Sequence, residues 1–256
     1  MQRLIGDFWC ICKNYDRAII WYHKAANQGH AGAQFRLGVL FGGGLGGTKN
    51  GAESIIWYRK AAKQGHAKAQ IVLGLSYAKA HSLAKNDDEA IIWIRKAAES
   101  EYAEAEFNLG VRYEKGLGVP KDRDEAIVWI RKAAEQGHAK AQFTIGVKYL
   151  RGWGVPKNDA QGVGWIHKAA DQGNADAQLA MGLYYSESSG VHRNDAESIV
   201  WFRKAAEQGD ATAQLCLGVS YLTCVDVPKD RDEAIIWLRK AAEQGDSDAQ
   251  AYLALV

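Results

Sequence analysis

The chain has 256 residues, of which 47% are hydrophobic and 24% are charged, and its formal net charge is +2. A charge this small gives no global field that would draw the protein to nucleic acid or to a membrane surface, and its apolar runs are too short to span a bilayer. We therefore expect neither nucleic acid nor a membrane among its partners.

Residues 1–11 are predicted to form a partial first helix. The string Ile5–Trp9 has the same apolar, glycine and aromatic spacing as helices later in the chain, but the connector after it is four residues shorter. Asp7 interrupts the apolar residues, so this segment does not have the pattern of an export signal. We expect a cytoplasmic protein whose four cysteines are thiols; a periplasmic or secreted location stays open.

Seven tryptophans then recur every 36 residues, at Trp21, Trp57, Trp93, Trp129, Trp165, Trp201 and Trp237. A strict period of this length indicates stacked repeats. Each period contains a first helix with small residues, as in 141–149, and a tryptophan helix, as in 125–137. Glycine and proline in 116–120 separate the two helices, and Asp122 or Asp124 is expected to cap the second. The seven tryptophans are expected to form a buried ladder.

Glycines and histidines at fixed places in the repeat have structural interpretations. Gly146 is expected to let a neighbouring helix approach closely. Gly162 and Gly164 are expected to weaken the fifth tryptophan helix, each by on the order of 1 kcal/mol relative to alanine. A turn position that other repeats fill with asparagine or aspartate holds a histidine at His30, His66 and His138, which predicts an N-cap.

The last segment, residues 247–256, reads as another first helix with no second helix after it. Such a lone helix can cover the apolar face of the final hairpin. The sequence therefore predicts that residues 1–256 form one all-α solenoid of about seven helix pairs plus a C-terminal capping helix, with about fifteen helices and no strands.

The strings Ala103–Tyr113, Gly116–Asp122 and Ala126–Ala134 resemble the pattern of Sel1-like repeats, a branch of the tetratricopeptide superfamily. The resemblance covers nearly the whole chain. It implies a right-handed superhelix that serves as a non-enzymatic scaffold or adaptor for other proteins, and it does not specify the partner. We expect a monomer without a cofactor.

Positions that differ between repeats are free of the stacking constraint, and on the first helix they step by four, four and three residues along one face. The resemblance places this face on the concave wall, and we call it the first-helix stripe. It begins with Gly32 and Arg36, and its predicted partner-binding residues are Lys68, Lys79, Glu104, Asn108, Arg112, Lys115, Lys140, Thr144, Lys148, Arg151, Asp176, Tyr184 and Glu187. It continues through Thr212, Cys216, Ser220 and Thr223.

The charge of the first-helix stripe predicts the kind of partner. Its middle is basic, and it becomes acidic at Asp176 and Glu187. We therefore expect another protein, or an extended peptide with an acidic stretch, held by charge-assisted contacts. The Arg-Lys pair on the tryptophan helix, as at Arg95 and Lys96, recurs too regularly to specify a partner, and we expect each arginine to pair weakly with a glutamate four residues later.

Two alternatives to a general scaffold stay open. Ser76 and Lys79 match the Ser-x-x-Lys spacing of penicillin-recognising enzymes, which suggests a β-lactam-binding hydrolase, although the accompanying Ser-Asp-Asn and Lys-Thr-Gly strings are missing. An immunity-type protein that neutralises an effector is a special case of the scaffold. The histidines have no ligand-like spacing with cysteines or carboxylates, so we predict no metal site and no catalytic residues.

Overall fold

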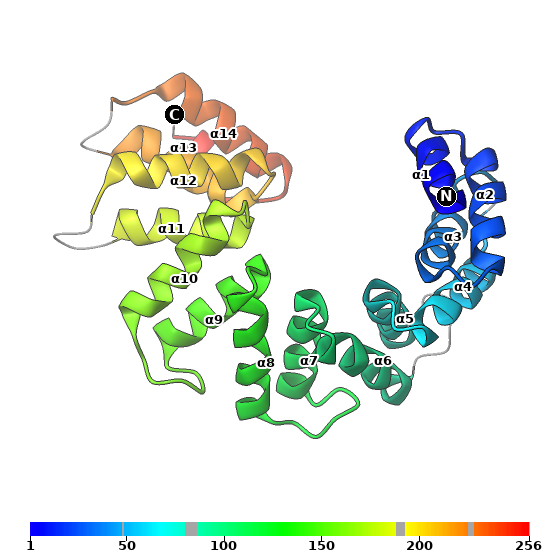
Figure 1. Cartoon of the computed structure of the whole chain (residues 1–256). Coiled ribbons are helices and arrows are strands. Elements are labelled where there is room, and N and C mark those ends of the chain that lie inside the picture. The colour runs from blue at the N-terminus through cyan, green and yellow to red at the C-terminus, as the bar shows by residue number, and fades with distance from the viewer. Residues whose placement is uncertain (48, 80–85, 188–192, 225–227, 256) are drawn as a thin grey trace. The chain divides into compact units, whose positions relative to one another are not determined.

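The computed structural model describes residues 1–47, 49–79, 86–187, 193–224 and 228–255, with the backbone alone of Lys79 and Glu187. Every regular element in these ranges is an α-helix, which confirms the all-α prediction and the expected fifteen helices (Figure 1). The helices are α1 (Gln2–Ile11), α2 (Tyr15–Asn27), α3 (Ala31–Gly43), α4 (Gly51–Lys63), α5 (Ala67–Lys79), α6 (Asp87–Glu99), α7 (Ala103–Lys115), α8 (Arg123–Glu135), α9 (Ala139–Arg151), α10 (Asp159–Asp171), α11 (Ala175–Glu187), α12 (Asp195–Glu207), α13 (Ala211–Thr223), α14 (Arg231–Glu243) and α15 (Ser247–Leu253).

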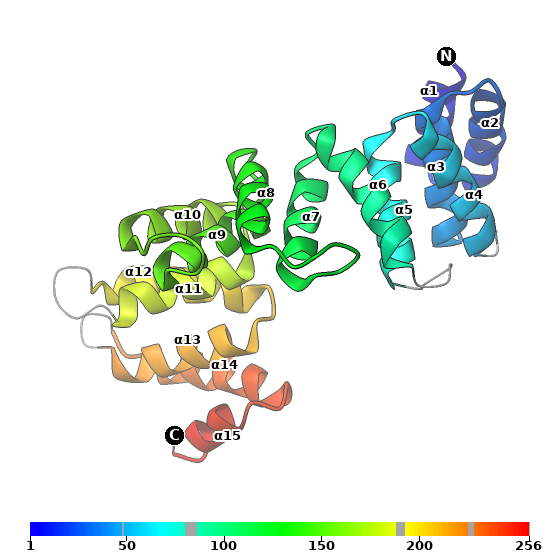
Figure 2. The ribbon, with the colours of Figure 1, turned by 90° about the horizontal axis from the view of Figure 1, so that it is seen from below.

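The helices group into two compact units, residues 1–136 with α1–α8 and residues 137–256 with α9–α15. In the first unit α1 packs on α2, α3 on α4, α5 on α6 and α7 on α8, and each hairpin also packs on the next. The second unit repeats this order from α9 to α14, and α15 lies against α14 and α13 at its end (Figure 2). The predicted capping helix is thus present, whereas a single domain for residues 1–256 stays a prediction.

Most of the helices begin with a residue whose side chain caps the first turn. Asp122, and not Asp124, caps α8 by accepting from the backbone N–H groups of Asp124 and Glu125. The predicted histidine caps are confirmed, because Nδ1 of His30, His66 and His138 accepts from the amide three residues on, at 3.2–3.3 Å. These caps satisfy backbone donors that have no preceding turn to bond.

In five of the seven tryptophan helices, the residue after the tryptophan is a large side chain that is almost completely buried. Tyr22, Ile94, Ile130, Phe202 and Leu238 are at most 2% exposed. The expected ladder of seven buried tryptophans is wrong: the buried ones are Trp57, Trp201 and Trp237, whereas Trp21, Trp93, Trp129 and Trp165 stay partly exposed. The tryptophan lies at the junction with the preceding hairpin, and neighbouring side chains cover its ring to a different extent in each repeat. The residue after the tryptophan packs inside its own hairpin.

Glycine on the first helix makes room for that inner residue. A Cβ on Gly146 would lie 2.7 Å from Cγ1 of Ile166 and 2.9 Å from the carbonyl oxygen of Gly162. Real side chains do not approach this closely, so the two backbones can meet only if one carries no side chain. The predicted close approach at Gly146 is therefore confirmed.

Gly164, in the middle of α10, gives a stability prediction. A Cβ there would meet no atom within 4 Å, whereas a Cβ on Gly162 would lie 2.7 Å from Cδ2 of Leu150. We expect Gly164→Ala to raise the free energy of unfolding by about 0.5–1 kcal/mol, because alanine has the higher helix propensity. Gly162→Ala, the matched control, is expected to gain less. Urea unfolding of the two variants checks the order, and an equal gain at both sites would contradict it.

The recurring Arg-Lys pairs contact aromatic rings. In all seven repeats the lysine ammonium lies over the ring of the tryptophan three residues before it, at 3.9–5.0 Å from the ring centroid. Arg59 and Arg95 donate to the hydroxyls of Tyr77 and Tyr113 on the next first helix, at 2.8 and 3.0 Å. The structural role is confirmed, but at Arg95 the partner is a tyrosine and not the expected Glu99.

A glutamine bridge also joins successive repeats. Gln34 donates from Nε2 to the carbonyl oxygen of Ala26 at 3.1 Å, and its Oε1 accepts from Nε2 of Gln64 at 2.7 Å. The same pair of bonds recurs at Gln178 and Gln214. The repeat formed by α5 and α6 departs from the pattern.

In that repeat Ser100 stands where the donor glutamine is expected, and Oε1 of Gln70 is buried without a partner among the described residues. In the next repeat, Glu106 of α7 replaces the bridging glutamine.

Candidate partner-binding surface

Three positions of the first-helix stripe meet at a cavity of about 420 Å³ in the first unit, which we call the N-terminal basic cavity. Gly32 and Arg36 come from α3, and Lys68 lies in the first turn of α5. The lining residues are Arg3, Gly32, Phe35, Arg36, His66, Ala67, Lys68 and Tyr102. The cavity therefore combines three cations with two aromatic rings.

The cations of this cavity are only partly neutralised. Arg3 and Arg36 both lie near the carboxylate of Asp7, at 3.8 and 3.6 Å. The Arg36 side chain is 52% exposed, and Lys68 is exposed. The three cations outnumber the carboxylates of Asp7 and of Glu104, whose charge acts on Tyr102, so the cavity keeps a positive charge that favours an anionic group.

His66 supplies the lining with a neutral donor. Its Nδ1 accepts from the backbone N–H of Ala69 at 3.3 Å, so the neutral ring carries its proton on Nε2. The ring stacks on Phe35, with centroids 4.7 Å apart. Burial is the main cause that lowers the pKa of His66; a backbone hydrogen bond opposes this, and the positive charges of Lys68 and Arg36 lower the pKa further, so the neutral ring is favoured.

Helix α5 adds a favourable dipole at the same place. Residues 67 and 68 are its first two positions, and the N-terminal amides of a helix have no preceding turn to bond. The end of a helix that carries these amides attracts negative charge. The arrangement can hold a carboxylate by charge, by hydrogen bonds and against an aromatic wall.

Arg112 and Lys148 do not lie on the exposed part of the stripe, which corrects the prediction for both. They are 5% and 8% exposed. Arg112 donates from Nη1 to the carbonyl oxygen of Leu117 at 2.9 Å and lies 3.4 Å from Oδ1 of Asp87. The third position of the stripe faces the connector and the adjacent tryptophan helix, so a long cation there is used inside the stack.

Other stripe residues do reach solvent. Lys115 and Glu104 are exposed in the first unit, and Lys140, Arg151 and Asp176 are exposed in the second. Whether any of them contacts a partner stays a prediction.

Three stripe residues are engaged within the protein. Asn108 and Thr144 bond the backbone oxygens of Glu104 and Lys140 on their own helices, each at 2.7 Å. Tyr184 is half-buried, edge-on to Tyr185. The side chains of Lys79 and Glu187 lie outside the described residues.

The structure gives limited support to the hydrolase that the Ser-x-x-Lys motif suggests. Ser76 is partly buried, and its Oγ donates to the carbonyl oxygen of Val72 at 2.8 Å, so this hydroxyl is engaged within its own helix. Within the described ranges, no group of three or more histidine, cysteine and carboxylate side chains could hold a metal ion. Over the same ranges, no helix has both the length and the apolar character needed to cross a membrane.

Sequence reasoning missed several residues of the N-terminal basic cavity, above all Arg3 and Tyr102. A signal for Arg3 existed: aligning Gly6 with Gly38 pairs Arg3 with Phe35, a position that holds an apolar residue in the full repeats. A cation at a position that is apolar in the other repeats indicates that this position has a different role at Arg3. Tyr102 stands where other repeats have a capping residue, and it makes no side-chain cap.

Comparison with known proteins agrees with the repeat. The Sel1 repeat family model matches residues 11–30, 31–66, 67–102, 103–138, 139–174, 175–210 and 211–246. None of the curated proteins compared with the chain matches it.

Among solved structures, a Sel1 repeat protein from Oxalobacter formigenes is 33% identical with a TM-score of 0.87, covering 99% of this chain and 75% of its own. A protective antigen with an SLR fold from uropathogenic Escherichia coli is 33% identical with a TM-score of 0.81, covering 98% of this chain. This chain spans only 55% of that antigen.

More distant structures share the fold alone. An immunity protein from Pseudomonas aeruginosa is 19% identical with a TM-score of 0.54, and the match covers 83% of this chain and 81% of that one.

Proposed function

The chain belongs to the Sel1 repeat family, and on that premise we propose that it is a non-enzymatic scaffold that binds an acidic segment of a partner protein at the N-terminal basic cavity. Sel1 repeats generally mediate protein–protein interaction. The observation that carries the proposal is the meeting of Arg3, Arg36 and Lys68 around one cavity, where these cations outnumber the nearby carboxylates of Asp7 and Glu104. A partner's aspartate or glutamate side chain matches its charge and its donors.

A pair of charge reversals tests the proposal. We expect a library of Asp- and Glu-rich peptides to bind, and their Asn- and Gln-matched counterparts to fail. Arg36→Glu with Lys68→Glu should weaken acidic-peptide binding at least about tenfold per residue, since a hydrogen bond to a charged group contributes about 1.5–3 kcal/mol. Fluorescence polarisation measures both effects.

Two further measurements distinguish binding at the N-terminal basic cavity from a general effect of the protein's charge. Lys63→Glu, an exposed reversal in the last turn of α4, is the control and should leave binding nearly unchanged. A bound anion should also raise the pKa of His66, which NMR of the imidazole signals reports. Equal binding of acidic and amide peptides, or an equal loss with Lys63→Glu, would defeat the proposal. The immunity-type function stays a prediction within this class.

A further inference from the structure

One face of helix α1 is apolar and reaches solvent. Leu4, Phe8 and Ile11 are 60%, 56% and 81% exposed. Their spacing of four and three residues places them on one side of the helix. Gly6 lies on the opposite side, where a Cβ would meet the ring of Tyr22 on α2 at 2.7 Å. Helix α1 therefore packs on its hairpin partner with one side and presents apolar side chains on the other. We call Leu4, Phe8 and Ile11 the α1 apolar patch.

The α1 apolar patch occupies positions of the first-helix stripe. Gly6 has the same role in α1 as Gly38 has in α3, because a Cβ on Gly38 would lie 2.5 Å from the ring of Tyr58, the residue after the tryptophan of that hairpin. Counted from these glycines, the three patch residues align with three stripe positions of α3, namely Arg36, Leu40 and Gly43. The stripe thus continues onto α1, where its side chains are apolar.

The short connector after α1 explains why Phe8 is exposed. Leu40, at the same stripe position, is 2% exposed. In α7 the connector reaches the side chain at this position, because Arg112 donates to the carbonyl oxygen of Leu117 at 2.9 Å. Residues 116–122 form that connector, whereas residues 12–14 alone join α1 to α2. So short a connector does not extend back over Phe8.

The α1 apolar patch borders the N-terminal basic cavity. Arg3 lines the cavity and directly precedes Leu4. Asp7 directly precedes Phe8 and lies 3.8 Å from Arg3 and 3.6 Å from Arg36 of α3. The cations of the cavity and the apolar side chains of the patch therefore lie on adjoining faces of one helix, and a single polypeptide segment can contact both.

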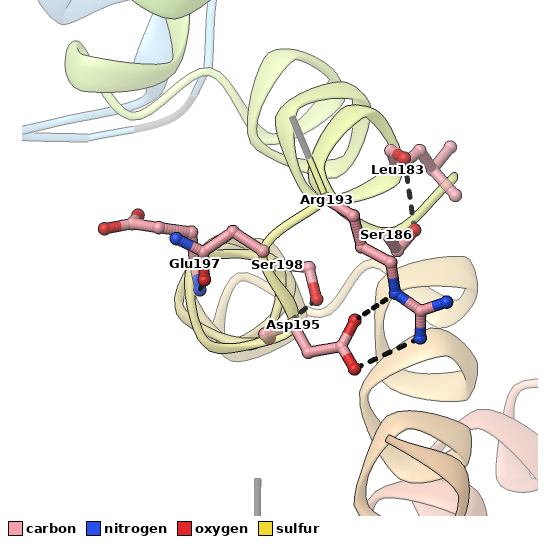
Figure 3. Close-up of polar contacts among 7 residues, drawn as sticks. Leu183, Ser186, Arg193, Asp195, Glu197 and Ser198 are labelled. Atoms are coloured by element: carbon pink, nitrogen blue, oxygen red, sulfur yellow. Dashed lines mark hydrogen bonds and ion pairs between the residues drawn. The ribbon is translucent and has the colours of Figure 1, made fainter. Parts of the chain in front are cut away.

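A charged pair in the second unit shows the contrast with this surface. Asp195, at the start of α12, is 2% exposed, and its two carboxylate oxygens accept from Nε and Nη2 of Arg193 at 3.0 and 3.2 Å (Figure 3). This carboxylate has its counter-ion within the protein, as a buried charge requires. The cations of the N-terminal basic cavity instead outnumber their nearby carboxylates, so charge complementarity to a partner is expected there.

We propose that the acidic segment bound at the N-terminal basic cavity has apolar residues beside its carboxylates, and that these apolar side chains pack on the α1 apolar patch. The inference rests on the proposed binding of an acidic segment. The cations hold the carboxylate, and contact with Leu4, Phe8 and Ile11 removes apolar surface from water on both sides. The patch is about 10 Å long, which is about three residues of extended chain. The apolar residues therefore lie within a few positions of the acid.

Designed peptides test this inference. Each labelled peptide has a run of glutamates beside a Leu-Ser-Leu string, with the glutamates first in one version and last in the other. Its matched counterpart has serine in place of leucine. We expect the leucine peptide of one chain order to bind at least about tenfold more tightly than its serine counterpart, because leucine side chains leave water on binding. Fluorescence polarisation measures the affinities.

Variants of the patch locate the effect. Leu4→Ser with Phe8→Ser should reduce the affinity for the leucine peptide to that for the serine peptide, and should leave the serine peptide unaffected. Ile11→Ser, at the most exposed patch residue, is the milder second variant and should weaken the leucine peptide at least about threefold. Ile20→Ser with Ile56→Ser is the matched control, because these side chains are exposed to a similar degree, 54% and 46%, on tryptophan helices. Circular dichroism establishes that each variant is folded.

The outcomes distinguish this inference from the proposed function. Arg36→Glu with Lys68→Glu should abolish binding of both glutamate peptides, and unchanged binding would refute the acidic site itself. Equal binding of the leucine and serine peptides to the wild type would refute the apolar contact alone. So would a leucine preference that persists in the folded patch variants or is lost equally in the control.

Two further results would assign the patch to a different occupant. If the leucine peptide binds as tightly with glutamines in place of its glutamates, the patch binds apolar segments regardless of charge, and the proposed partner is wrong. Sedimentation velocity of the protein without peptide tests a second copy of the chain. Self-association that the folded Leu4→Ser, Phe8→Ser protein loses would assign the patch to that second copy and overturn the inference.

Discussion

Replacing Trp57 by alanine is expected to lower the free energy of unfolding by about 3–5 kcal/mol, the range for truncating a buried tryptophan. Trp57 is 4% exposed and packs in one core with Leu37 of its own hairpin and Tyr22 of the preceding hairpin. Its Nε1 donates to Oε1 of Glu53 at 2.8 Å, and Lys60 lies over its ring at 4.1 Å. The substitution therefore removes apolar contacts and leaves two charged side chains without the ring. Urea unfolding followed by circular dichroism measures the loss.

Trp129 is the matched control for this experiment. It occupies the same position of the repeat and has the same lysine contact, at 4.3 Å, but it is partly exposed. Trp129→Ala should therefore lower the free energy of unfolding clearly less than Trp57→Ala does, because folding buries less of the apolar surface of Trp129. Equal losses at the two sites would show that the repeat position, and not the local burial, determines the energy.

Glu106→Gln is expected to stabilise the protein by about 1–3 kcal/mol at neutral pH, the cost of a buried polar group without its bond. Glu106 is 2% exposed, and one oxygen accepts from Nε2 of Gln136 at 2.7 Å. In other repeats the glutamine at this position donates to a backbone oxygen eight residues earlier. An ionised carboxylate cannot donate, so the glutamate leaves that bond unmade unless it is protonated.

The sign of the pH dependence follows from the surroundings of Glu106. Burial raises its pKa; Lys132 opposes the rise, and Glu101 and Glu135 add to it. Glu106, Glu99, Glu101 and Glu135 line one cavity. A raised pKa means that the folded state binds this proton more tightly, so the stabilisation is complete at pH values below the unfolded pKa and is lost as pH rises through the folded pKa. The advantage of Glu106→Gln should therefore grow from acidic to neutral pH.

Unfolding midpoints in urea at a series of pH values measure this advantage. Glu104→Gln, an exposed change on the same helix, is the control and should show little pH dependence. A constant difference between wild type and Glu106→Gln at all pH values would contradict the assignment. So would a less stable Glu106→Gln at neutral pH.

The helical repeat could be predicted from the sequence because the residues that begin, end and space its helices act locally. The capping side chains and Gly146 each contact residues of a single hairpin, and the hairpins recur with the 36-residue period. Each of these features lies where it was expected. Which aromatic residues are buried was harder to predict. Burial of Trp57 but not of Trp129 depends on how completely the neighbouring hairpin covers each ring, and the repeated string itself is nearly the same at both.

The binding surface was predicted less well, for a related reason. Variation between repeats does not always mean freedom from packing, because Arg112 is buried beside Asp87, another varying residue. Pairs that vary together inside the stack look the same in sequence as residues exposed to a partner. Conversely, Arg3 lies outside the regular period, so only the fold brings it to Arg36 and Lys68.

The bonds between neighbouring hairpins have a consequence for how the chain folds. The arginine–tyrosine bonds join residues 18 apart, and the glutamine bonds to the preceding hairpin join residues 8 apart. Loops this short close at a small entropic cost, and proteins with such local contacts reach the native state quickly. Two adjacent hairpins contain both partners of each of these bonds, so the bonds can form as soon as the second hairpin has been synthesised, before the rest of the chain is available.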